Sequence, residues 1–115
     1  LCIGGNDLLR RMDEATTRSH IQRTVALAQA AGAQVLLIAV PRPTLAARFT
    51  GKLSDHPMYG ELSEALRVPL HRQGWAEVLG DDRLRADAIH ANAEGYAAFA
   101  RGLMATLRAT GLFAG

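Results

Sequence analysis

The sequence predicts an α/β fold with a parallel sheet between layers of helices. The first reason is the segment 34–40, Gln-Val-Leu-Leu-Ile-Ala-Val, which is apolar in successive positions rather than in alternate ones. A strand that is apolar on both faces is typical of a parallel sheet covered by helices on both sides. The second reason is the order of the expected elements, which alternates strand, helix, strand, helix, strand, helix. Together they predict a three-layer α/β/α arrangement.

The chain opens on a short apolar run, Leu1–Ile3, which two glycines interrupt. This run is expected to be the tail of a buried strand. Cys2 would then be buried and unreactive. Residues 8–12 are expected to form a short helical turn after the glycines.

A longer helix is expected next, with Thr16 or Thr17 as its N-cap. Gly32 fits the position just after its last turn, where a left-handed backbone favours glycine. Four residues recur at helical spacing and are expected to face the core: Ile21, Val25, Ala28 and Ala31.

The second half of the chain begins where Pro41 and Pro43 end the strand at 34–40. Residues 42–57 are expected to form a loop. A helix over 59–65 and a third short strand over 67–70 complete the alternation.

A helical turn is expected at 75–79, a polar loop at 81–90 and a final helix over 92–110. Asn92 is the expected N-cap of that helix. Its core-facing positions are expected to be Tyr96, Phe99, Leu103 and Leu107.

Composition narrows the range of functions. The chain has 115 residues, of which 49% are hydrophobic, so it is one domain or part of one, with enough apolar residues for a core. The formal net charge is only +2 and the charges are interspersed, so we expect no nucleic-acid partner. The single cysteine excludes an intrachain disulfide.

Two sequence motifs contain residue types that are typical of catalytic sites. Asp87 precedes His90 by three residues just ahead of a helix, a compact way to join an orienting carboxylate to a general base. Gly4-Gly5-Asn6 follows an apolar run and is able to turn a side-chain amide toward a site. Sites in α/β folds form at the carboxyl ends of strands, so the turn, Pro41 and the His90 loop are expected to share one rim. Alone, Gly-Gly-Asn is often an ordinary turn.

Gly4-Gly5-Asn6-Asp7 resembles the third conserved block of the SGNH (GDSL-type) hydrolases. The segment 87–96, with Asp87, His90, Asn92, Gly95 and Tyr96, resembles their fifth block. The similarity is closest to the branch of thioesterase I, lysophospholipases and arylesterases, and it implies a flavodoxin-like three-layer fold. Ala91 departs from the family, which commonly has proline there.

The resemblance implies an acyl hydrolase that uses neither a metal nor an organic cofactor. His90 would be the general base and Asp87 its partner. Asn6, with Gly5, would donate hydrogen bonds to the oxyanion. The substrate would be a small-molecule ester or thioester.

The segment after the strand at 34–40 supplies the candidate substrate contacts Pro41, Arg42 and Leu45. A solvated loop charge is the default role for Arg42. Four apolar residues are candidates either for an acyl pocket or for ordinary packing: Leu45, Phe49, Met58 and Trp75. The other histidines lack a carboxylate at matching spacing and are expected to be solvated or structural: His20, His56 and His71.

The family's nucleophilic serine block and its glycine block have no counterpart here. None of Ser19, Ser54 and Ser63 has the expected context. Residues 1–115 are therefore expected to be the carboxyl-terminal part of a single hydrolase domain that lacks the nucleophile segment and the first strands. The expected partners are that missing segment or a second copy, paired through the edge at Leu1–Ile3. The family implies a periplasmic or secreted location, with a cytoplasmic one also open. The alternative is a non-catalytic binding or assembly chain with the same fold.

Overall fold

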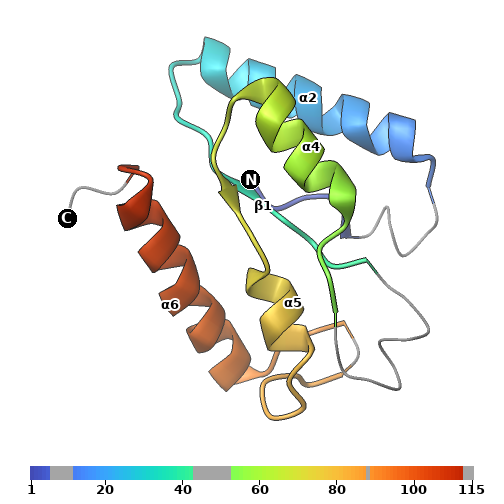
Figure 1. Ribbon diagram of the computed structural model, residues 1–115, viewed down its shortest axis with the longest axis vertical. Coiled ribbons are helices and arrows are strands. Elements are labelled where there is room, and N and C mark those ends of the chain that lie inside the picture. Colours follow the sequence, from blue (N-terminus) through green and yellow to red (C-terminus); the bar gives the residue numbers. More distant parts are fainter. Residues whose placement is uncertain (6–11, 43–52, 88, 113–115) are drawn as a thin grey trace.

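The computed structural model describes residues 1–5, 12–42, 53–87 and 89–112. This part of the chain contains a two-stranded parallel sheet and four helices (Figure 1). Strand β1 (Leu37–Ile38) pairs in parallel with β2 (Leu70–His71), and Leu37 lies opposite Leu70. The α/β class and the parallel sheet are confirmed, although both strands are shorter than the apolar runs predicted.

Strand β1 has hydrogen-bonded neighbours on both sides. On one side the N–H of Ala39 donates to the carbonyl of His71 at 3.1 Å. On the other, the N–H of Ile38 donates to the carbonyl of Leu1 at 2.9 Å. The first residues therefore lie where the predicted strand would be, but they do not form a regular strand. The expected burial of Cys2 is wrong: its side chain is exposed, because side chains alternate along an extended chain and its neighbours Leu1 and Ile3 take the core side.

Helix α2 (Glu14–Ala30) begins three or four residues earlier than expected. Asp13 is its N-cap, and the carboxylate of Asp13 accepts a hydrogen bond from the N–H of Ala15. The prediction of a threonine cap is therefore wrong, and Thr17 is instead buried within the first helical turns. Gly32 follows the helix with φ of +85°, as predicted.

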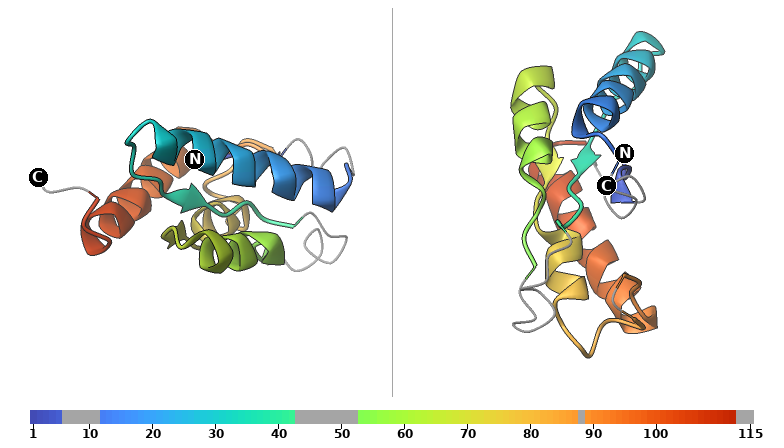
Figure 2. Two further views of the ribbon diagram at one scale, coloured as in Figure 1. Left: turned by 90° about the horizontal axis from the view of Figure 1, so that it is seen from above. Right: turned by 90° about the vertical axis from the view of Figure 1, so that its right-hand side faces the viewer.

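Helix α4 (Pro57–Leu66) lies across β1 from α2, so that β1 runs between the two helices (Figure 2). The expected strand over 67–70 begins late, because Arg67 adopts a left-handed conformation that ends α4. The fully buried side chains of this region are Ile21, Val25, Leu37, Ala39, Met58, Tyr59 and Leu62. Met58 is thus a core residue rather than a pocket residue.

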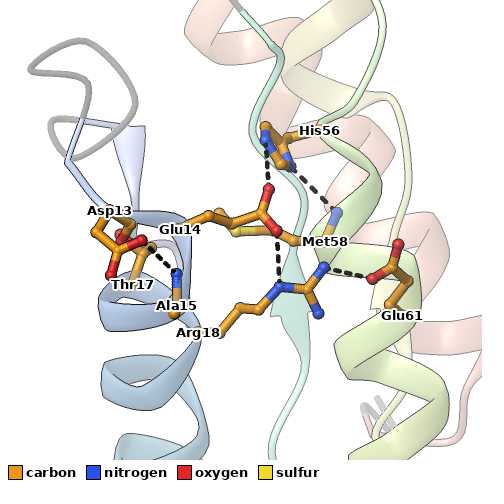
Figure 3. A network of polar contacts seen from close by, with 8 residues as sticks. All are labelled: Asp13, Glu14, Ala15, Thr17, Arg18, His56, Met58 and Glu61. Atoms are coloured by element: carbon orange, nitrogen blue, oxygen red, sulfur yellow. Dashed lines mark hydrogen bonds and ion pairs between the residues drawn. The ribbon is translucent and has the colours of Figure 1, made fainter.

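A polar network joins the starts of α2 and α4 (Figure 3). Glu14 accepts a hydrogen bond from Nε of Arg18 and lies 3.3 Å from Nε2 of His56, and Arg18 also pairs with Glu61. Nδ1 of His56 accepts the N–H of Met58 at 3.1 Å and so caps α4. His56 is therefore structural, as predicted, and its carboxylate partner Glu14 comes from 42 positions away in the sequence.

Helices α5 (Gly74–Leu79) and α6 (Ala93–Ala109) pack against each other, and α5 follows the end of β2 (Figure 1). The ring of Trp75 stacks on that of Phe99, with 3.7 Å between centroids and 9° between planes. Asn92 caps α6, as predicted, by accepting the N–H of Gly95 at 2.9 Å. Among the described residues, no helix is both long and apolar enough to cross a membrane.

Candidate functional site

A cleft of about 470 Å³ opens at the carboxyl end of β1. Segments that are far apart in the sequence meet there: the amino-terminal turn, the end of β1, α5, the loop before α6 and α6 itself. The lining residues are Cys2, Ile3, Gly4, Gly5, Val40, Pro41, Trp75, Leu79, Ile89, His90, Ala91 and Tyr96. The structure therefore brings the Gly4-Gly5 turn, Pro41 and His90 to one rim.

His90 and Asp87 form a side-chain pair at this cleft. Nδ1 of His90 lies 3.0 Å from Oδ2 and 3.1 Å from Oδ1 of Asp87. Oδ1 also accepts the backbone N–H groups of Ile89 and His90, each at 2.8 Å. The bond from Ile89, followed by the bond from the His90 ring, lowers the pKa of Asp87 below its usual range.

The ionised carboxylate only accepts hydrogen bonds, so Nδ1 of His90 must carry the proton in this pair. Nε2 is then left with a free lone pair when the ring is neutral. This is the tautomer that a general base requires. The pair is exposed, with 61% of the His90 side chain accessible, so solvent reaches it freely.

The loop that carries this pair is held at both ends. The N–H of Ala86 donates to the carbonyl of His90 at 2.9 Å, which closes the loop on itself. The side-chain amide of Asn92 donates to the carbonyl of Arg83 at 2.9 Å while its oxygen caps α6. The three-residue spacing between Asp87 and His90 therefore fits a closed turn that hydrogen bonds hold on both sides.

The Gly4-Gly5 turn is fixed by its contact with α4. Gly4 has φ of +108°, and a Cβ at this position would lie 2.4 Å from the hydroxyl of Tyr59. That hydroxyl donates a 2.7 Å hydrogen bond to the carbonyl of Ile3. Only glycine combines this backbone angle with such a close approach. Gly5 lines the cleft, whereas Asn6 lies outside the described residues.

The three candidate substrate contacts have different positions. Pro41 lines the cleft and forms an isolated antiparallel bridge with Asp55. Arg42 is exposed and is not among the lining residues, and its backbone N–H donates to the carbonyl of Ser54 at 2.8 Å. Leu45 lies outside the described residues.

Sequence reasoning missed most of the apolar lining. Tyr96 was expected in the core, but it is 53% exposed at the cleft. Tyr96 meets the ring of Trp75 edge to face, whereas Phe99, one turn later, stacks on that ring. Ile89 is 49% exposed and also lines the cleft. The position of Ile89 directly before His90 is the sequence feature that could have placed it at the cleft.

The described lining of the cleft contains no serine. Ser19 is exposed on α2, and Ser54 lines a different cavity. The hydroxyl of Ser63 donates to the carbonyl of Val68 at 2.6 Å. Within the described part of the chain, no group of three or more His, Cys, Asp or Glu side chains is arranged to hold a metal ion.

Comparison with known proteins identifies a fold rather than a family. No family model matches the sequence, and no curated protein matches it significantly. Among solved structures, the fold is similar to that of the protein in the crystal structure of TesA, with a TM-score of 0.75 and 24% sequence identity. The match covers 91% of this chain but only 58% of that one.

Proposed function

We propose that this chain supplies the His–Asp pair and the oxyanion turn of an SGNH-type serine hydrolase acting on esters or thioesters. The observation that carries the proposal is the 3.0 Å contact between His90 and Asp87 at a cleft shared with the Gly4-Gly5 turn. The resemblance of the two motifs to those of the SGNH hydrolases and the fold shared with TesA support it. The complete domain would be a three-layer α/β/α structure.

In this proposal, Nε2 of His90 takes the proton of a serine hydroxyl as that oxygen attacks the acyl carbon. Asp87 stabilises the resulting imidazolium. Asn6 and the N–H of Gly5 donate hydrogen bonds to the oxyanion of the tetrahedral intermediate. The imidazolium then returns the proton to the leaving group, and a water molecule repeats the sequence to release the acid.

The nucleophile has to come from outside these 115 residues, because none of the three serines lines the cleft. The match covers 58% of TesA, and the proposal places the nucleophile in a segment comparable to the unmatched part of that protein. We therefore expect the 115-residue chain by itself to have no more than trace esterase activity. Robust turnover of a short-chain aryl ester by the pure chain, blocked by a serine-directed phosphonate, would overturn this.

The role of His90 as the general base is tested in the gene product, including any residues that flank this chain. Hydrolysis of a short-chain aryl ester and of an acyl thioester is measured for the wild type and for His90→Ala. We expect kcat to fall by roughly 10⁵-fold or more, as when the base of a serine triad is removed. His20→Ala is the matched control, because His20 is exposed on α2 and away from the cleft. Near-full activity of the His90 variant would show that the assignment of the base is wrong.

The alternative is a binding or assembly chain with the same fold, and the cleft without a serine is what favours it. The two proposals differ in one result. A binding chain would show no ester or thioester hydrolysis with any flanking residues included, and His90→Ala would then affect ligand affinity alone.

A further inference from the structure

We propose that the cleft wall formed by Trp75, Ile89 and Tyr96 binds the leaving group of the substrate and selects one that carries an apolar ring. This inference rests on the proposed function. It assigns these side chains to the released alcohol or thiol rather than to the acyl chain.

The position of the wall relative to His90 is the first argument. Ile89 directly precedes His90, and Tyr96 lies near the start of α6, which follows the His90 loop. All three wall residues and His90 line the same cleft. The Gly4-Gly5 turn and the end of β1 line this cleft as well.

Chemistry decides which part of the substrate faces which side. The general acid must reach the leaving atom to protonate it, so that atom lies within hydrogen-bond distance of His90. The carbonyl oxygen turns toward the N–H groups of the Gly4-Gly5 turn. The group attached to the leaving atom therefore continues past His90 along the side formed by Ile89 and Tyr96.

The exposure of the wall is the second argument. Tyr96 is 53% exposed and Ile89 is 49% exposed, although both are large hydrophobic side chains. Exposed apolar surface gathered at a cleft is typical of a binding site, whereas a single exposed residue elsewhere is ordinary. Leu27, which is 64% exposed on α2 and does not line the cleft, is such an ordinary case.

The arrangement of the rings indicates the shape of the bound group. Trp75 and Tyr96 meet edge to face, with 5.8 Å between centroids and 86° between planes. Phe99 stacks on Trp75 and holds that ring in place. Two perpendicular rings form a corner in which a third ring can lie flat on one and present its edge to the other, and both contacts are favourable. A linear alkyl chain makes less favourable contacts with two rings arranged in this way.

Because Trp75 is the single tryptophan of the chain, its fluorescence reports occupancy of the wall without any turnover. The probes are benzyl alcohol, a ring-bearing product alcohol, and hexanoate, a product acid. We expect benzyl alcohol to change the Trp75 emission in a saturable way and hexanoate to do so only at much higher concentration. Tyr96→Ala and, separately, Ile89→Ala are expected to weaken the benzyl alcohol affinity by about threefold or more.

Leu27→Ala is the matched control and is expected to leave the affinity unchanged. Circular dichroism checks the fold of each variant, and Tyr96→Leu replaces Tyr96→Ala if that variant unfolds. Tighter binding of hexanoate at Trp75 would assign the wall to the acyl chain and overturn the proposal. Unsaturable changes with both probes would overturn it as well, by showing that the rings serve packing alone. Loss of hydrolysis in His90→Ala tests the proposed catalysis, whereas saturable benzyl alcohol binding at Trp75 in the chain with His90 intact tests this inference, so the two failures are distinguishable.

Discussion

The hydroxyl of Tyr59 donates a 2.7 Å hydrogen bond to the carbonyl oxygen of Ile3, which lies 56 positions earlier in the chain. Tyr59 is fully buried in α4, and Ile3 directly precedes the Gly4-Gly5 turn at the cleft. A core residue therefore fixes the backbone that we propose as the oxyanion turn. The position of Gly4 against the same hydroxyl makes this contact open to a direct test.

Gly4→Ala is expected to destabilise the protein much more than Gly32→Ala. Both glycines have positive φ, so alanine carries a backbone cost of roughly 1–2 kcal/mol at each. A Cβ at Gly32 meets nothing within 4 Å, whereas a Cβ at Gly4 meets the Tyr59 hydroxyl at 2.4 Å. The additional cost at Gly4 is expected to be about 1–3 kcal/mol from overpacking. Urea unfolding of the two variants measures the difference.

A double variant separates the clash from the backbone strain. Tyr59→Phe removes the hydroxyl, after which the nearest atoms to the new Cβ lie at 3.5 and 3.6 Å, an ordinary contact distance. Gly4→Ala is therefore expected to cost less in the Tyr59→Phe background than in the wild type, with a coupling of about 0.5–3 kcal/mol. Strict additivity of the two changes would mean that the hydroxyl does not limit the space at Gly4.

Asn92→Ala is expected to lower the free energy of unfolding by about 1–2 kcal/mol, because it removes the cap of α6. It also frees the carbonyl of Arg83, which the Asn92 amide holds at 2.9 Å. Asn92→Asp keeps the oxygen that accepts the N–H of Gly95 and loses only the donor to Arg83. Its cost, measured in the same denaturation series, is expected to be the smaller one. An equal cost for both variants would argue that the bond to Arg83, rather than the cap, carries the stability.

Stability is expected to fall as the pH drops below about 6.5, and His56 is one cause. Burial, with a contribution from Arg42, lowers the pKa of His56 below its ordinary value of 6.5, although Glu14 acts in the opposite direction. Protonation would also remove the Nδ1 lone pair that accepts the N–H of Met58. The unfolded chain therefore binds more protons at His56 than the folded one below pH 6.5. The contribution of His56 to the free energy of unfolding is complete above that pH and is lost as the pH falls toward the lower pKa of the folded state.

His56→Asn tests this pH dependence, because asparagine is able to cap α4 without titrating. The difference in melting temperature between pH 7.5 and pH 5.5 is expected to shrink in this variant. It does not vanish, because burial also lowers the pKa of His71. His20→Asn, on the exposed face of α2, is the control and is expected to keep the wild-type difference. An unchanged pH dependence in His56→Asn would exclude His56 as a source of it.

Asp87→Asn is expected to lower kcat in the active gene product by about 10³- to 10⁴-fold, less than the loss of His90. The amide that replaces the carboxylate is able to donate to Nδ1, which favours the tautomer with the proton on Nε2. Asp82→Asn, in the same loop but paired with Arg85, is the matched control. Steady-state kinetics with one ester measures both variants. A kcat close to that of the wild type for Asp87→Asn would show that the backbone alone orients the imidazole.

Local features of the fold were predictable from the sequence because they depend on neighbouring residues. Gly32 ends α2 and Asn92 starts α6 for reasons contained within a few positions. The Asp87-His90 contact is of the same kind, since a closed turn of four residues brings the two side chains together. The apolar run at 34–40 correctly indicated a strand buried on both faces, although only Leu37–Ile38 is a regular strand.

By itself, the sequence determined the fold class, the Asn92 cap of α6, the glycine after α2 and the local pair of side chains, whose energies depend on contacts a few residues apart. Only the tertiary structure decided that Cys2 and Tyr96 are exposed at a cleft, that His56 meets Glu14, and that the hydroxyl of Tyr59 holds Ile3. Those relationships join segments tens of residues apart, and their positions depend on how the helices pack around β1. Spacing in the sequence carries no information about such contacts, because hydrophobic burial is non-directional and the packing of whole elements selects the partners.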